Sequence, residues 1–165
     1  MVNEVGKDVV RFTMLTRKAD AQMDFDFAKV VEASKDNPVF YVQYAHARVA
    51  SLQRRTAEAG IACADVDLSL LDTQELRLVK AAAQFPRIVE AAASAREPHR
   101  IAFYLYDLAA ELHSLWNLGK DDASRRFLIP DQAALTCARL YLARSIGQIV
   151  RNGLRIMGVE AVQEM

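Results

Sequence analysis

The chain has 165 residues, which is enough for one domain with a complete hydrophobic core, or for one domain and a small appendage. Hydrophobic residues make up 52% of the sequence and charged residues 25%, with only 6 Gly and 4 Pro, so disordered, collagen-like and low-complexity proteins are excluded. The 21 Lys and Arg residues balance the 21 Asp and Glu residues, and a net charge of zero, taken alone, argues against a polyanionic partner such as nucleic acid.

The first 36 residues differ from the rest of the chain. Residues 4–15 predict a short helix with Val5, Val9 and Phe12 on its buried face. Residues 23–27 alternate apolar and acidic side chains, which is typical of a strand. We therefore expect a small α/β appendage ahead of the helices.

Three long helices are predicted next, over residues 38–58, 98–117 and 132–157. Pro38 and Pro98 open the first two as first-turn prolines, and Asp131 is expected to cap the start of the third. Glycines follow all three ends and are expected to adopt the left-handed conformation that ends a helix: Gly60, Gly119 and Gly158.

Apolar residues recur every three or four positions in these helices, as in helices with one buried face. In the second helix this stripe is Ile101, Leu105, Leu108, Leu112 and Leu115, and in the third it is Leu135, Ala138, Leu142, Ile146, Ile149, Gly153 and Met157. Gly147 and Gly153 weaken the third helix, which indicates that a neighbouring helix approaches closely there.

A further helix is predicted to begin near Asp72, because Asp72 and Glu75 have the spacing of a capping box. Pro86 predicts a break within it, and residues 61–71 before it are expected to form a loop. The side chains expected to face the core are Leu76, Val79, Ala83, Ile88 and Ala92. The expected fold is therefore mainly α: an antiparallel helical bundle with a small N-terminal α/β appendage.

The two cysteines, Cys63 and Cys137, lie far apart in the sequence and outside any His/Cys cluster. They indicate neither a disulfide framework nor a zinc site, and a reducing, cytoplasmic setting fits. No apolar run approaches the roughly 18 residues that span a bilayer, and the charged N-terminus does not resemble a signal peptide.

Charge is distributed unevenly along the chain. There are three Arg and no acidic residue between Asp36 and Glu58, and four Arg and no acidic residue between Asp131 and Glu160. Two helix faces combine these Arg residues with aromatic or amide side chains: Tyr41, Tyr44, Arg48 and Arg55 on the first helix, and Tyr141, Arg144, Gln148, Arg151 and Arg155 on the last. Guanidinium groups pair with phosphates and aromatic rings stack on unpaired bases, so these faces fit RNA. A solvated basic face with Tyr packed at its rim is the alternative.

The remaining polar residues do not form a recognisable active site. His46 and His113 have the spacing of buried histidines, and Trp116 shares the face of His113. The sequence contains no glycine-rich phosphate loop, no Ser/His/Asp arrangement and no helical pair of catalytic carboxylates.

Residues 34–48 (SKDNPVFYVQYAHAR) closely resemble the start of the helical anticodon-binding domain of bacterial arginyl-tRNA synthetases. Residues 2–12 and 23–27 resemble that family's stem-contact segment, residues 98–117 its central bundle helix, and residues 148–158 (QIVRNGLRIMG) its last helix. The resemblance covers essentially the whole chain. It implies a stem-contact-like segment over residues 1–35 and an anticodon-binding bundle of the class I synthetase type over residues 36–165.

The resemblance further implies that the bundle binds the anticodon stem-loop of arginine tRNA, with the extreme C-terminus close to the loop. Together with the basic faces, it gives these candidate tRNA-binding residues: Tyr44, Arg48, Tyr141, Arg144, Gln148, Arg151, Arg155 and Met165. The tail departs from the family, because Ala161 stands where Pro is frequent and Glu164 where a basic residue is common.

The parent enzyme implied by the resemblance is an ATP-dependent arginine–tRNA ligase of cytoplasmic translation that uses magnesium. The family's His-Ile-Gly-His-type and Lys-Met-Ser-Lys-type signatures are missing, so we expect Met1 to begin a monomeric fragment that has no catalytic residue, metal or cofactor and does not aminoacylate by itself. Its expected partners are arginine tRNA and the absent catalytic domain of the same chain, with no membrane or DNA partner. The alternative is a helical protein-interaction scaffold without RNA binding, which the neutral net charge and Ala-rich helices favour.

Overall fold

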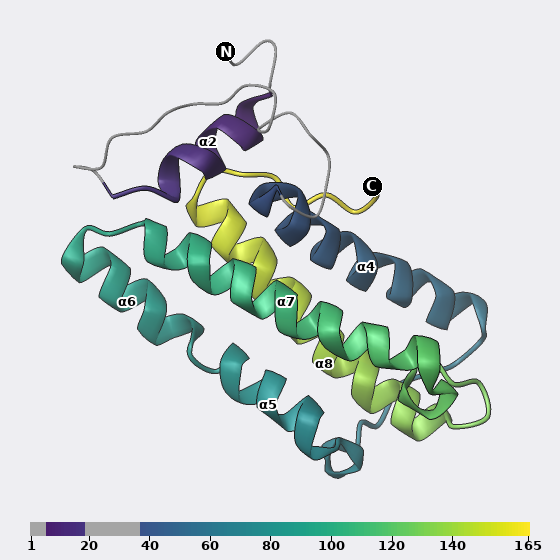
Figure 1. Cartoon of the computed structure of the whole chain (residues 1–165). Helices are drawn as coiled ribbons and strands as arrows, with labels where there is room; N and C mark the ends of the chain where they lie inside the picture. The colour runs from purple at the N-terminus through teal and green to yellow at the C-terminus, as the bar shows by residue number, and fades with distance from the viewer. Residues whose placement is uncertain (1–5, 19–36) are drawn as a thin grey trace.

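Figure 1 presents a computed structural model of the chain, which describes residues 6–18 and 37–165. Within these ranges the α-helices are α2 (Lys7–Leu15), α4 (Pro38–Glu58), α5 (Thr73–Ala82), α6 (Phe85–Ala95), α7 (His99–Asp121) and α8 (Ala133–Ile156). Short 3-10 turns occupy Leu68–Leu70 and Ala123–Arg125, and the described residues contain no strand. The strand predicted over residues 23–27 and the predicted burial of Val5 lie outside the described residues.

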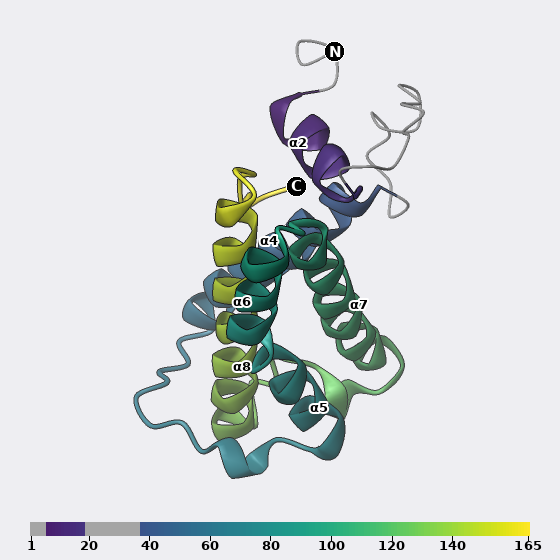
Figure 2. The same ribbon diagram turned by 90° about the vertical axis from the view of Figure 1, so that its left-hand side faces the viewer.

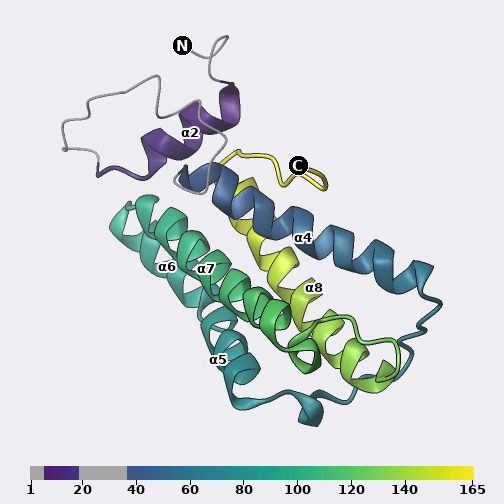
Figure 3. The ribbon, with the colours of Figure 1, turned by 45° about the vertical axis from the view of Figure 1, so that its right-hand side comes forward.

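The helices form an antiparallel bundle around α7. In Figures 1 and 3, α4 and α7 run in one direction, and α5, α6 and α8 run back in the other. Helix α7 contacts α4, α5, α6 and α8, and α8 also contacts α4. The mainly α, antiparallel bundle expected from the sequence is confirmed.

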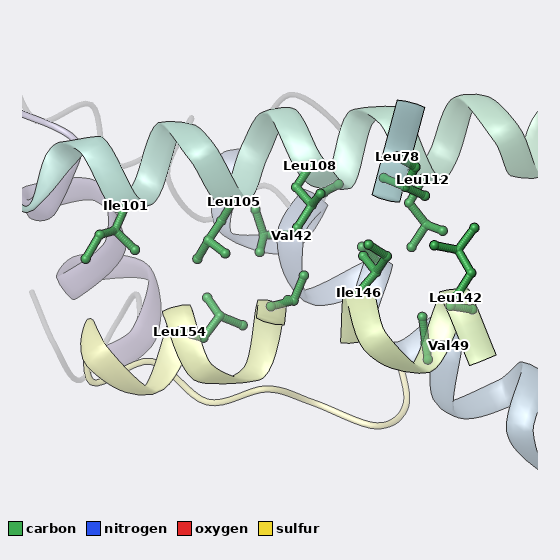
Figure 4. Close-up of a cluster of buried hydrophobic side chains, with 14 of the residues drawn as sticks. Val42, Val49, Leu78, Ile101, Leu105, Leu108, Leu112, Leu142, Ile146 and Leu154 are labelled. Carbon is green, nitrogen blue, oxygen red and sulfur yellow. The ribbon is translucent and has the colours of Figure 1, made fainter. Parts of the chain in front are cut away.

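The apolar stripes of α4, α7 and α8 meet in the core (Figure 4). The α7 stripe is buried as predicted from Ile101 to Leu112, with Leu105 and Leu112 fully enclosed, whereas Leu115 is half-buried. Both glycines inside α8 allow close helix approach, as expected. A Cβ added at Gly153 would lie 2.7 Å from Leu105 Cδ2, and one at Gly147 would lie 2.9 Å from Val49 Cγ1.

Two of the three predicted glycine caps are confirmed. Gly60 and Gly158 each have φ of +68°, a conformation that side chains with a Cβ rarely adopt. Gly119 is not a cap, because α7 continues to Asp121. It instead lies against the returning chain, where a Cβ would sit 3.0 Å from the Cα of Arg126.

The starts of the helices differ in detail from the expectation. Pro38 is in the first turn of α4, and the preceding Asn37 side chain accepts a hydrogen bond from the Val39 amide at 3.3 Å. Pro98 precedes the first helical residue of α7 rather than occupying it. Asp131 does not cap α8, which begins after Gln132. Near the start of α8, the Thr136 hydroxyl accepts a hydrogen bond from the Ile129 amide and donates one to the Ile129 carbonyl, each at 2.9 Å.

Helix α5 begins with the predicted capping box, in which Asp72 accepts from the Glu75 amide and Glu75 from the Asp72 amide. The helix breaks before Pro86, also as predicted. Its buried face was predicted wrongly: Glu75 and Leu78 point inward, because the Glu75 carboxylate binds a buried arginine of α8. Of the predicted inward residues, Ala92 is buried and Ile88 half-buried, whereas Leu76, Val79 and Ala83 are exposed.

The expectation that the two cysteines are unrelated is wrong. Cys63 and Cys137 form a disulfide, with their Cα atoms 5.3 Å apart. The segment before α5 folds back over the start of α8, which brings together residues that lie 74 positions apart in the chain. Sequence separation carries no information about such a contact when no spacing motif accompanies it.

Helix α2 packs on the end of the bundle where the C-terminal segment lies (Figure 2). Val9 and Phe12 are buried as predicted. The Arg11 Nε donates to the Met157 carbonyl at 3.2 Å, and Asp8 accepts from the Glu160 amide at 3.0 Å. The described part of the N-terminal segment therefore contacts the C-terminal tail directly, and the domain boundary at residue 35 stays a prediction.

Candidate nucleic-acid interface

A hollow of 720 Å³ lies between α4 and α8, and we call it the α4–α8 groove. Its polar lining includes His46 and Arg54 of α4, Tyr141, Arg144, Gln148 and Arg151 of α8, and Gln163 of the tail. Arg144 and Arg151 are exposed and form no ion pair within the described part of the chain. Their positive charge is therefore available to a ligand.

A second hollow of 460 Å³ lies on the other side of the C-terminal tail, and we call it the Trp116 hollow. Tyr44, Arg48, Trp116 and Met165 line it, together with residues that also line the groove, Arg54 and Gln163. Gln163 of the tail, residues 159–165, lines both hollows and therefore lies in the wall between them. Figure 3 shows it passing over the first half of α4.

Arg48 is held in place by aromatic rings. Its guanidinium carbon lies 4.5 Å from the centre of the Tyr44 ring and 5.2 Å from that of Trp116. The Nη1 atom of Arg48 donates to His113 Nδ1 at 3.2 Å. Planar guanidinium stacking of this kind leaves the remaining N–H groups free to pair with a phosphate.

His113 is buried, as predicted, and connects Arg48 to the backbone of α4. Its Nε2 atom lies 3.3 Å from the Tyr41 carbonyl, so Nε2 carries the proton and Nδ1 accepts from Arg48. Burial lowers the pKa of His113, and the nearby Arg48 charge lowers it further, against the hydrogen bond to Tyr41. The ring is therefore neutral near pH 7 and acts as an acceptor for Arg48.

This lowered pKa predicts a loss of stability in mild acid. The unfolded chain binds a proton on His113 more readily than the folded chain, so stability is complete above the ordinary histidine pKa of about 6.5 and falls as the pH drops below it. Urea unfolding at about pH 7.5 and pH 5 measures this change. The His113→Gln variant should show a smaller difference between the two pH values than wild type, and an equal difference would contradict the assignment.

The structure gathers most of the predicted residues into two groups. Tyr141, Arg144, Gln148 and Arg151 line the groove, and Tyr44, Arg48 and Met165 line the Trp116 hollow. Arg155 lies apart from both, beside Phe85 and Ile156 in a hollow next to α6. Helices α4 and α8 cross at an angle (Figures 1 and 3), and Arg155 does not line the groove between them.

Arg139, one of the four Arg counted on the last helix, does not contribute to the basic face. It is 4% exposed, and its guanidinium binds the Glu75 carboxylate and the carbonyls of Ser124 and Arg126. The exposed charge of α8 is therefore carried by three Arg: Arg144, Arg151 and Arg155.

Sequence reasoning missed three residues of the two hollows. Trp116 was expected to be buried, but it is half-exposed and stacks with both Phe127 and Arg48. Arg54 lies off the aromatic and basic stripe of α4, yet lines both hollows. Gln163 is in the tail, where no periodic pattern places it. Of these three residues, only Arg54 has a signal in the sequence, because it directly precedes Arg55 of that stripe.

The family model of the DALR anticodon-binding domain matches residues 42–165, which include both hollows. The chain belongs to this family. The DALR domain therefore comprises the bundle from α4 onward, and the expected resemblance to anticodon-binding domains is confirmed.

Sequence relatives and solved structures agree with the DALR assignment. The chain is 66% identical over its whole length to an arginine–tRNA ligase of Novosphingobium aromaticivorans and 59% identical to one of Parvibaculum lavamentivorans. It spans only 28% and 30% of these relatives. The arginyl-tRNA synthetase structure of Thermus thermophilus superposes on 98% of the chain with a TM-score of 0.83 and 30% identity, and the match covers 27% of that protein.

The part of the chain that the structure describes contains no group of three or more His, Cys, Asp and Glu side chains that could hold a metal ion. No helix within it is long and apolar enough to cross a bilayer.

Proposed function

We propose that this DALR domain binds the anticodon stem-loop of arginine tRNA through the α4–α8 groove and the Trp116 hollow. The observation that carries the proposal is that Arg144 and Arg151, which are exposed and form no ion pair within the described residues, lie beside the exposed Tyr141 ring in one groove. Arginine pairs with two phosphate oxygens at once, which positions an RNA backbone. The exposed rings of Tyr141 and Tyr44 offer stacking surfaces, each of which contributes about 1–3 kcal/mol per stacked base.

The Trp116 hollow adds a third cation in a fixed place. Because Arg48 is stacked and hydrogen-bonded before any ligand arrives, it loses little conformational entropy on binding. The exposed Met165 at the end of the tail offers an apolar contact for a base next to it. Together the two hollows give a loop of single-stranded RNA both phosphate and base contacts.

We place this domain within a longer arginine–tRNA ligase of the cytoplasm. In this proposal, a catalytic domain of the same protein binds ATP and magnesium and carries out the ligation, and the DALR domain recognises the tRNA. The chain alone is then inactive in aminoacylation, and it binds RNA as a monomer without a cofactor.

A titration with labelled RNA tests the proposal. We expect the anticodon stem-loop of arginine tRNA to bind more tightly than the same stem with a scrambled loop, by about fivefold or more if one stacked base is lost. Affinity for both RNAs should fall as salt is raised from about 50 to 200 mM, because binding to phosphates releases counterions. Equal affinity for the two loops without salt dependence would support the protein-interaction scaffold instead.

The scaffold alternative has one observation in its favour. Leu68, Leu70, Leu76 and Val79 are each at least 38% exposed, on and before α5. This apolar surface lies outside both hollows. An RNA titration that fails while the chain stays folded would direct attention to this surface.

A further inference from the structure

His46 connects the C-terminal tail to the basic groove. Its ring is 4% exposed and lies in the middle of α4, facing α8. The Nδ1 atom is 2.7 Å from the Val162 carbonyl in the tail, and the Nε2 atom is 3.4 Å from Arg151 Nη2 on α8. One ring on α4 therefore contacts both other elements that line the α4–α8 groove, the tail and α8.

The chemistry of the two neighbours fixes the roles of the ring nitrogens. A carbonyl only accepts hydrogen bonds and a guanidinium only donates them. Nδ1 therefore carries the proton and donates to Val162, while Nε2 accepts from Arg151. His46 needs both ring nitrogens, in these two different roles, to hold the tail and the arginine at once.

Other contacts hold the tail along the same line. Gln43, one turn earlier on α4, donates to the Glu160 carbonyl at 2.9 Å. Arg54, two turns later, forms an ion pair of 3.5 Å with Glu164. The contact to His46 lies in the middle of this series, next to Gln163, which lines both hollows. His46 and Gln43 are both buried, whereas Arg54 is exposed.

We propose that His46 is a positioning residue of the RNA site, which sets the place of the tail and the direction of the Arg151 guanidinium together. Although His46 borders the groove, it is only 4% exposed, so its role in this proposal is to position other groups and not to bind RNA. The proposal rests on the proposed function for its effect on RNA, but its effect on the tail stands independently. It implies that the wall between the two hollows and the phosphate-binding arginine are linked through one side chain.

Two conservative substitutions separate the two roles of the ring. In His46→Asn, the amide nitrogen can occupy the place of Nδ1 and donate to Val162, but nothing reaches Arg151. In His46→Gln, the amide oxygen can occupy the place of Nε2 and accept from Arg151, while the donor to Val162 is removed. Amide hydrogen exchange of the tail, in which the Val159 and Glu160 amides are hydrogen-bonded to Leu154 and Asp8, measures tail docking, and titration with the arginine anticodon stem-loop measures RNA affinity.

We expect His46→Gln to increase amide exchange of the tail about tenfold, because the tail opens locally more often once the hydrogen bond to Val162 is lost. His46→Asn should keep wild-type tail exchange and bind the stem-loop about fivefold more weakly, which is the range of one missing hydrogen bond. The double variant His46→Asn/Arg151→Gln should bind the stem-loop no more weakly than Arg151→Gln alone, since both changes remove the same interaction. Wild-type tail exchange in His46→Gln, or additive decreases in the double variant, would overturn the proposal.

Two further results distinguish a failure of the proposed function from a failure of the role given to His46. If wild type itself does not bind the stem-loop, the proposed function fails, while tail exchange in His46→Gln still decides whether His46 holds the tail. If either substitution unfolds the chain, deletion of residues 162–165 is used instead. It removes the Val162 carbonyl, which accepts the hydrogen bond from His46, without changing the core. Arg151→Gln should then reduce affinity less in the shortened chain than in the full one, and an equal reduction would contradict the link.

Discussion

Replacing Glu75 with Gln is expected to lower the free energy of unfolding by about 3–5 kcal/mol, the typical cost of breaking a buried ion pair. The side chains of Glu75 and Arg139 are only 5–6% exposed, and Arg139 Nε lies 2.5 Å from a Glu75 carboxylate oxygen. A neutral amide would leave the guanidinium charge buried without a counterion. It would also weaken the capping box at the start of α5. Urea unfolding monitored by circular dichroism measures the change.

The exposed pair of Arg54 and Glu164 provides a matched control. These side chains are 46% and 80% exposed, so Glu164→Gln should change the free energy of unfolding by no more than about 1 kcal/mol. A similar small effect for Glu75→Gln would mean that the buried pair is not what joins α5 to α8. In that case the exposed position of Leu76 and Val79 would need another cause.

Reversing the charge of Arg144 or Arg151 is expected to weaken binding of the arginine anticodon stem-loop by roughly tenfold at low salt. Each substitution removes a phosphate partner and places a negative charge in the groove. The slope of log affinity against log salt should become shallower by about 1 for each phosphate that the variant no longer binds. Fluorescence anisotropy over a salt series measures both quantities for Arg144→Glu and Arg151→Glu.

Arg87→Glu is the control for this experiment. Arg87 is exposed on α6 and lies outside both hollows, so its reversal changes net charge equally without touching the groove. It should reduce affinity only slightly and leave the salt slope nearly unchanged. If Arg144→Glu and Arg151→Glu bind like Arg87→Glu across the salt series, the α4–α8 groove is a solvated surface.

The sequence predicted the long helices well because each combines a regular apolar stripe with local signals at its ends. Leu105 and Leu112 are buried as their spacing requires, and Gly147 and Gly153 mark the close approach of α8 to its neighbours. These features depend only on residues within a few positions of one another. Gly119 shows the limit, since its small size serves a close approach to Arg126 rather than a helix end.

The two largest errors share one physical origin, which is contact between distant segments. The buried face of α5 is decided by Arg139 on α8, and the pairing of Cys63 with Cys137 by how the segment before α5 folds back. For the same reason, the sequence predicted only part of the candidate site. Periodicity placed Tyr141, Arg144 and Arg151 on one face, whereas the tail that completes the groove has no periodic pattern. The same limit applies to His46: its burial followed from spacing, but its hydrogen bond to Val162 did not.

Mapping backbone amide chemical shifts while the arginine anticodon stem-loop is added tests the location of the interface directly. The predicted result is a continuous set of shifted residues on α4, α8 and the tail, including Tyr44, Arg48, Tyr141, Arg144, Arg151 and Met165, with α5 and α6 unchanged. Shifts centred on α5 and α6, with the α4–α8 groove unaffected, would contradict the proposed interface.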